Sequence, residues 1–160
     1  YSAAVEWAEK AAADARSSAA VVTESDYIRA KSLLATSRRD EALAVFGRLA
    51  ENPATSYGAE AAYIMITASY DEGLFEDVEN KVYDFADKAG DQQYWLAKAF
   101  VVLGDSFVDR KDYEQAKATF ESILSGYTPE KEDDVHDNVR MRLSRLDEMM
   151  KETSDADGEL

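Results

Sequence analysis

The sequence repeats a small residue at a nearly constant interval, and this period limits the folds that the chain can adopt. Ala4, Ala42, Val78 and Ala116 are spaced 38, 36 and 38 residues apart. An aromatic residue stands three positions before three of them, whereas Arg39 stands there in the remaining unit. Self-similarity at about 20–50 residues is typical of arrays in which each repeat stacks on its neighbours. We therefore expect one structural unit to recur along the chain.

The best-preserved unit spans residues 97–124 and has the pattern of two amphipathic helices joined by a tight turn. Apolar or small residues recur at i, i+3, i+4 and i+7 in both halves, as on one face of a helix. A glycine inside a helix costs about 1 kcal/mol relative to alanine. Gly104 stands inside the first of these helices. It predicts that another helix packs too closely there to admit a side chain.

This unit resembles a tetratricopeptide repeat (TPR). That family places Leu-Gly and an aromatic residue on the first helix of a hairpin, and Tyr, Ala and Phe on the second. The family period is about 34 residues, so each unit here is a few residues longer. The resemblance covers residues 1–126 and implies an all-α fold, a right-handed α-α superhelix, in the C-terminal segment of a longer bacterial protein. The matching residues are Leu103, Gly104, Phe107, Tyr113, Ala116 and Phe120.

The resemblance also implies one repeat domain over residues 1–152. A half repeat, the helix over residues 1–16, precedes three hairpins at about residues 23–56, 57–92 and 93–128. A helix over residues 133–152 would cap the array, because a terminal element with a polar outer face is needed there. The polar residues 153–160 are expected to form a flexible tail.

Local signals predict where several helices begin and end. Thr23 followed by Asp26 has the pattern of a capping box and predicts a helix that begins there. Pro53 predicts that the helix over residues 40–51 ends before it, since proline disfavours helix in the preceding residue. Gly73 suits the positive φ that often follows a helix. Asp91 is expected to cap the third hairpin.

The charge balance excludes two classes of partner. The formal net charge is -15, from 33 acidic and 18 basic residues. Affinity for nucleic acids and for anionic membranes comes largely from Lys and Arg, so we expect neither partner. The excess of acid is explained either by solubility or by electrostatic steering of a basic partner.

The sequence also lacks cysteine, a membrane-spanning segment and a leader segment at Tyr1. There is no cysteine, and therefore neither a disulfide framework nor a thiolate site. No apolar run approaches the roughly 20 residues of a membrane span, so direct membrane insertion is not expected. The sequence opens at Tyr1 without a basic or apolar leader, and we expect a processed protein or an excised segment.

Catalysis is not expected from this sequence. His136 is the only histidine, and its position at the start of the last helix is typical of a surface residue. No Gly-x-Ser-x-Gly elbow and no glycine-rich phosphate loop occurs. Acidic residues are so frequent that close pairs arise by chance, and none is marked by an apolar setting. We therefore predict no enzyme activity, no cofactor and no metal site.

The resemblance implies a protein-binding groove on the first helix of each hairpin. Tyrosine is favoured at interfaces, because it combines apolar area with a polar tip. Tyr63 and Tyr70 could equally pack between neighbouring repeats, and the sequence leaves these two interpretations open. Tyrosine, threonine and aspartate dominate, so a neutral or basic segment would suit the groove. Its residues would be Tyr27, Lys31, Leu34, Tyr63, Thr67, Tyr70, Asp71, Val101, Asp105, Val108 and Asp109.

The function expected by resemblance is a non-catalytic scaffold that binds a protein or peptide in this groove. One alternative is self-association, as a homodimer, within a bacterial envelope assembly protein. A second alternative is a docking arm for an enzyme domain that lies upstream. By analogy with envelope repeat proteins, the expected compartment is the bacterial cell envelope or periplasm, with the cytoplasm as the alternative.

Overall fold

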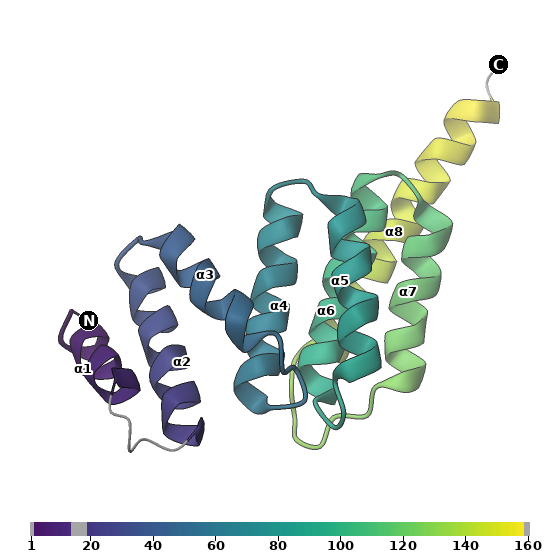
Figure 1. Ribbon diagram of the computed structural model, residues 1–160. Coiled ribbons are helices and arrows are strands. Elements are labelled where there is room, and N and C mark those ends of the chain that lie inside the picture. Colours follow the sequence, from purple (N-terminus) through teal and green to yellow (C-terminus); the bar gives the residue numbers. More distant parts are fainter. Residues whose placement is uncertain (1, 14–18, 159–160) are drawn as a thin grey trace.

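The structure is a computed structural model that describes residues 2–13 and 19–158, with side chains described for residues 3–10 and 19–153. This part of the chain is entirely helical and contains no strand, which confirms the all-α prediction. Figure 1 shows the helices in a row that runs from α1 at one end to α7 and α8 at the other. They are α1 (Ser2–Ala13), α2 (Ala19–Ala35), α3 (Arg39–Leu49), α4 (Ser56–Asp71), α5 (Phe75–Lys88), α6 (Gln93–Asp109), α7 (Tyr113–Gly126) and α8 (Val135–Gly158).

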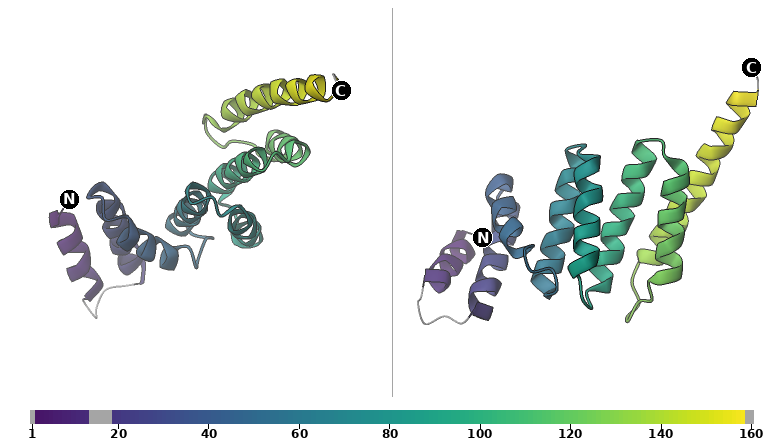
Figure 2. Two further views of the ribbon diagram at one scale, coloured as in Figure 1. Left: turned by 90° about the horizontal axis from the view of Figure 1, so that it is seen from above. Right: turned by 45° about the vertical axis from the view of Figure 1, so that its right-hand side comes forward.

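Two rules describe how these helices pack. Each helix contacts the next one in the sequence, and each even-numbered helix also contacts the next even-numbered one. No two odd-numbered helices contact each other within the described residues. The even-numbered helices therefore form a continuous connection from α2 to α8. Figure 2 shows that α8 diverges from this row towards its C-terminal end.

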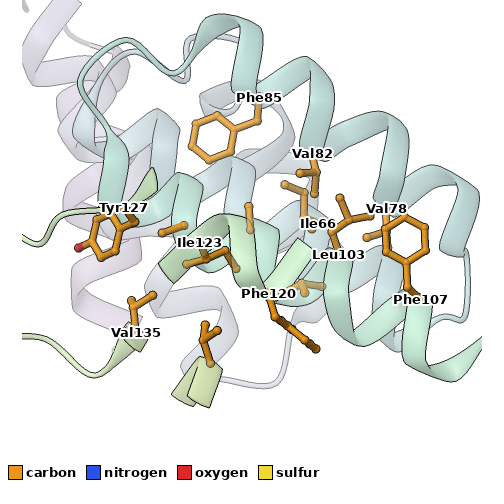
Figure 3. Packing of buried hydrophobic residues seen from close by; sticks show 14 of the residues in the cluster. Ile66, Val78, Val82, Phe85, Leu103, Phe107, Phe120, Ile123, Tyr127 and Val135 are labelled. Carbon is orange, nitrogen blue, oxygen red and sulfur yellow. The ribbon is translucent and has the colours of Figure 1, made fainter. Parts of the chain in front are cut away.

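The hydrophobic core consists of two clusters. The smaller one joins α2, α3 and α4 and contains the fully buried Leu33 and Phe46. The larger one runs from α4 to α8 and includes Ile66, Leu103 and Phe120, as Figure 3 shows. Burying one such side chain stabilises the fold by roughly 1.5–3 kcal/mol. The apolar stripes in the sequence thus mark the core. The helix faces outside these two clusters remain available for binding.

Two glycines allow close approach between elements. A Cβ on Gly104 of α6 would lie 2.3 Å from Cε1 of Phe120 on α7, so the predicted close packing at this position is confirmed. The close packing at Gly58 was not predicted from the sequence. A Cβ there would lie 1.9 Å from the backbone oxygen of Asn52, in the turn between α3 and α4. Both glycines therefore set how closely neighbouring elements can pack.

The turn after α4 also follows its prediction. Gly73 has φ 72°, and the next amide, that of Leu74, donates to the Ser69 carbonyl over 2.9 Å. A glycine in the left-handed region at this position commonly ends a helix and satisfies its last carbonyl groups. This turn brings α5 back against α4.

Several predicted boundaries are wrong. Helix α2 begins at Ala19, so Thr23 lies inside the helix and its hydroxyl donates to the Ala19 carbonyl over 2.9 Å. The apolar residues 19–22 bring no helix breaker, and the helix extends through them. Asp91 does not cap α6, because Gln92 is the N-cap residue and makes no side-chain cap hydrogen bond. Residues 14–16 of the first predicted helix lie outside the described residues.

The last helix is longer than predicted. Helix α8 runs to Gly158, whereas the sequence predicted a flexible tail from residue 153. No proline and no glycine interrupts residues 135–157. Thr153 donates its hydroxyl to the Met149 carbonyl over 2.9 Å and so stays within the helical hydrogen-bond pattern. Polar composition alone therefore does not end this helix.

Candidate functional site

Two of the three predicted groove residues of α2 contact the adjoining helix α4. The Tyr27 ring stacks on Tyr57 with ring centroids 4.6 Å apart. Its hydroxyl donates to Glu60 over 2.8 Å, and Lys31 donates to the same carboxylate over 2.9 Å. Burial raises the pKa of the Tyr27 phenol, and Glu60 raises it further. Leu34, the third predicted residue on α2, is exposed.

The predicted tyrosines of α4 connect this helix to α6. The Tyr63 ring lies 5.5 Å from the Trp95 ring, measured between centroids. The Tyr70 hydroxyl donates to Asp109 over 2.7 Å. Burial, followed by this hydrogen bond, raises the pKa of the Tyr70 phenol well above its ordinary value. Both tyrosines thus pack between neighbouring helices, which is one of the two interpretations that the sequence leaves open.

The other predicted residues of α4 make local contacts. The Thr67 hydroxyl donates to the Tyr63 carbonyl one turn earlier, over 3.0 Å. Asp71 is exposed at the end of the helix and lies 3.6 Å from Arg39 of α3. Arg39 occupies the position that is aromatic in the other repeats, and here it forms an ion pair instead. Ion pairs as exposed as this one contribute little to stability.

Asp105 of α6 forms a two-point ion pair with α8. Arg142 donates through Nε and Nη2 to the two carboxylate oxygens over 2.8 and 2.9 Å. Such bidentate pairs are stronger and more directional than single charged hydrogen bonds. The pair also raises the pKa of the Arg142 guanidinium, which keeps it charged. The charge of Asp105, which the sequence placed free in the groove, is therefore neutralised within the chain.

Three predicted groove residues border one cavity of about 320 Å³, which is lined mostly by even-numbered helices and also by Phe120 of α7. Tyr70 comes from α4, and Asp105 and Val108 come from α6. Helix α8 supplies the opposite wall, and its Arg142 side chain reaches Asp105 of α6. The remaining lining residues are Phe120, Met141, Arg142, Arg145, Leu146 and Met149.

The cavity does not include the other predicted residues. Val101 is half-buried against the larger core cluster, and Asp109 accepts the Tyr70 hydrogen bond. The residues of α2 lie at the other end of the row of helices, as Figure 1 shows. The predicted groove is therefore brought together only in part, around α4, α6 and α8.

The sequence analysis did not identify the α8 side of this cavity. The last helix was interpreted as a cap, and its main apolar stripe does pack into the core through Val139 and Leu146. A second pattern was present, because Met141, Arg145 and Met149 are spaced by four residues and share one helical face. That spacing was the available signal for these residues.

Removing the charge at position 142 provides a test of the ion pair. We expect Arg142→Met to lower the free energy of unfolding by about 1–2 kcal/mol, because Asp105 loses two charge-assisted hydrogen bonds in a partly buried setting. Urea denaturation at neutral pH measures this change. Arg140→Met is the matched control, since its pair with Asp137 is exposed and should contribute less than about 0.5 kcal/mol. Equal midpoints for the two variants would contradict the stabilising role of the pair.

Three further observations concern metal ligands, His136 and membrane-spanning helices in the described residues. No group of three or more His, Cys, Asp or Glu side chains there has a metal-binding arrangement. His136 is half-buried, and its Nε2 lies 3.0 Å from the Tyr127 carbonyl oxygen. This contact corrects the expectation of a surface histidine. No helix in the described ranges is both long and apolar enough to cross a membrane.

Comparisons with protein-family models, curated proteins and solved structures gave no match for this chain. Function is therefore inferred from the residues and from their geometry.

Proposed function

We propose that this chain is a TPR-like repeat protein that binds, without catalysis, an extended segment of another protein on the face of its even-numbered helices. The alternation of contacts supports this architecture, because even-numbered helices contact one another and odd-numbered helices do not. The cavity between α4, α6 and α8 is the observation that carries the functional part of the proposal. The lining of this cavity combines groove residues that were predicted from the sequence with residues of α8.

The lining of the cavity defines the chemistry of the segment. Met141 and Met149 supply flexible, polarizable walls that adapt to different apolar side chains. Met141 is 52% exposed, so its side chain is accessible to a ligand. Because Arg142 already neutralises Asp105 and Arg145 is a second cation in the lining, the cavity does not present the strong negative charge that the composition suggests. A neutral segment with one large apolar side chain fits this site best.

A selection from a random peptide library tests this function. We expect the enriched peptides to share a large apolar residue and to bind the Met141→Glu variant at least about tenfold more weakly, since a carboxylate at the cavity wall opposes apolar burial. Fluorescence anisotropy of labelled peptides measures the affinity. Tyr63 and Tyr70 are less suitable for this test, because both hold α4 against α6.

Tyr83→Glu is the matched control for this experiment. Tyr83 is 49% exposed on α5, an odd-numbered helix, and is about as accessible as Met141. The control variant should bind the selected peptides as the unmodified chain does. Peptides that bind both variants equally, or a library that yields no binder, would contradict the proposal.

A further inference from the structure

A second cleft, of about 590 Å³, lies at the other end of α6. It is bounded by the turn before α6 and by the connection over residues 127–134 between α7 and α8. Three aromatic side chains contribute to its lining, namely Tyr94 and Trp95 from the first turn of α6 and Tyr127 from the connection. None of these residues lines the cavity beside α8, so the two sites have separate walls.

The wall formed by the connection is held in place by the chain itself. The Tyr127 side chain is buried, and its hydroxyl donates to Asp133. The other carboxylate oxygen of Asp133 accepts from the Val135 amide over 3.0 Å, at the first residue of α8. His136 contacts the Tyr127 carbonyl at 3.0 Å, and its ring lies edge-on to the tyrosine ring. The cleft therefore exists before any ligand arrives, which lowers the entropy cost of binding.

The charge around this cleft is strongly negative. Four of its lining residues are acidic, whereas Lys131 is its only basic lining residue in the described part of the chain. Asp133 is engaged as described, but Glu130 and Glu132 are exposed and form no hydrogen bond or ion pair with the described residues. Asp91 lies just before α6 and offsets the positive end of that helix dipole. The cleft thus has uncompensated negative charge beside aromatic rings.

The aromatic cluster already holds an ammonium group of the chain itself. Nζ of Lys98 lies 4.8 Å from the centroid of the Tyr63 ring. It lies 5.3 Å from the Tyr94 centroid and 5.1 Å from the Trp95 centroid. Cations within about 6 Å of a ring are attracted by the negative face of its π-system. Two of the three rings that line the cleft thus already contact an ammonium group, and because Lys98 does not line the cleft, a ligand cation would have to contact these rings from the side of the cleft.

We propose that this cleft binds an alkylammonium group of a ligand between its aromatic rings and its free carboxylates. Aromatic surfaces combined with acidic groups recognise such cations, because the rings replace part of the water that a quaternary ammonium group binds weakly. Both a lysine side chain of a peptide and a free quaternary ammonium compound carry a positive charge on an alkyl nitrogen, but the lysine ammonium is more strongly hydrated and can donate hydrogen bonds to the carboxylates. This site adds a cation-specific contact to the proposed scaffold and does not depend on the cavity beside α8.

The experiment is a titration of the whole chain with tetramethylammonium chloride, followed through the indole signal of Trp95 in ¹H–¹⁵N NMR spectra. The chain has two tryptophans, so a Trp7→Phe background makes Trp95 the only reporter. We expect a saturable shift of this signal. Sodium chloride at equal ionic strength and tert-butanol, a neutral analogue of similar shape, should give no saturable shift. A response that is the same for all three compounds would overturn the proposal.

Two variants test which groups bind the cation. Glu130→Gln combined with Glu132→Gln should weaken binding about fivefold or more, because two carboxylates next to the cation are removed. Tyr94→Leu should weaken it about two- to fivefold through the loss of one ring face. If both variants bind as the background does, the assignment of the site is wrong.

The control variants have the same types of substitution at positions outside the cleft. Glu76→Gln combined with Glu114→Gln changes the net charge equally, at the first turns of α5 and α7. Glu114 is separated from the cleft by most of α7, a distance of roughly 18 Å. Tyr83→Leu removes an exposed tyrosine on α5. Both controls should retain the affinity, and an equal loss in the acid-removing control would show only a general effect of net charge.

Two ligand sources are distinguished by separate arms of the titration. Choline represents the free quaternary ammonium compound, and the peptide acetyl-Gly-Lys-Gly-amide represents a protein side chain. The arm with the lower dissociation constant identifies the source. Saturation by neither ligand, together with none by tetramethylammonium, would overturn the proposal. Met141→Glu should leave all three titrations unchanged, so failure here is separable from failure of the scaffold function.

Discussion

Gly58→Ala is expected to lower the free energy of unfolding by about 3 kcal/mol, at the upper end of the range for overpacked sites. The added Cβ would lie 1.9 Å from the Asn52 oxygen and 2.9 Å from the Leu49 oxygen. Both obstacles are backbone atoms, one at the end of α3 and one in the turn between α3 and α4, so no side-chain rotation relieves the contact. A chain of this size is typically stable by only about 5–15 kcal/mol, and the loss is therefore large.

Urea denaturation followed by circular dichroism measures this effect. Gly47→Ala is the matched control, because Gly47 lies inside α3 and a Cβ there would meet only the flexible end of Met65 at 4.0 Å. That substitution should raise the stability by about 0.5–1 kcal/mol through helix propensity. A Gly58→Ala midpoint at or above that of the unmodified chain would show that the turn can move away at little cost.

Gly104→Leu should destabilise the chain by about 1–3 kcal/mol through overpacking. The contact is with the fully buried Phe120 ring, which would lie 2.3 Å from an added Cβ. The ring is packed in the larger core cluster, and one side of it borders the cavity beside α8, so only part of the overlap can be relieved. The same denaturation experiment reports the change, and an unaltered midpoint would show that α6 and α7 separate easily.

A second variant separates the effect of overpacking from the effect of helix propensity. Gly104→Ala adds one methyl group and gains about 1 kcal/mol of helix propensity, so its net effect should be smaller than that of leucine. Gly126→Ala is the control on α7, because nothing lies within 4 Å of the position of its Cβ. If Gly104→Ala and Gly126→Ala stabilise the chain equally, the close approach at Phe120 contributes nothing.

The sequence predicted the helical elements better than their boundaries. The periodic apolar residues around Phe46, Val82 and Phe120 indicated helices, and all three side chains are buried. Boundaries depend on weaker local signals, and at Thr23 a plausible cap pattern lies within a longer helix. Capping contributes about 1 kcal/mol, which extension through several residues with good helix propensity readily outweighs.

The candidate site could be predicted only in part. The sequence identified residues on the faces left free by the core, and three of them, Tyr70, Asp105 and Val108, border the cavity beside α8. It did not predict that Asp105 would be neutralised by Arg142, which follows 37 residues later. Nor did it indicate that Tyr94 and Trp95 would share a cleft with Glu130 and its neighbours.

The sequence by itself determined the all-helical fold and the recurring unit, because both follow from the 3.6-residue period and from local propensity. It also determined that Gly104 must face a close neighbour. The tertiary structure alone decided which charges are free and which are paired. The contacts that pair Glu60, Asp105 and Asp109 with other helices join residues about 30–40 positions apart, and the angle between packed helices decides which of them meet. Helix α8 diverges from the other helices at such an angle, and the cavity therefore stays open beside the ion pair of Asp105 and Arg142.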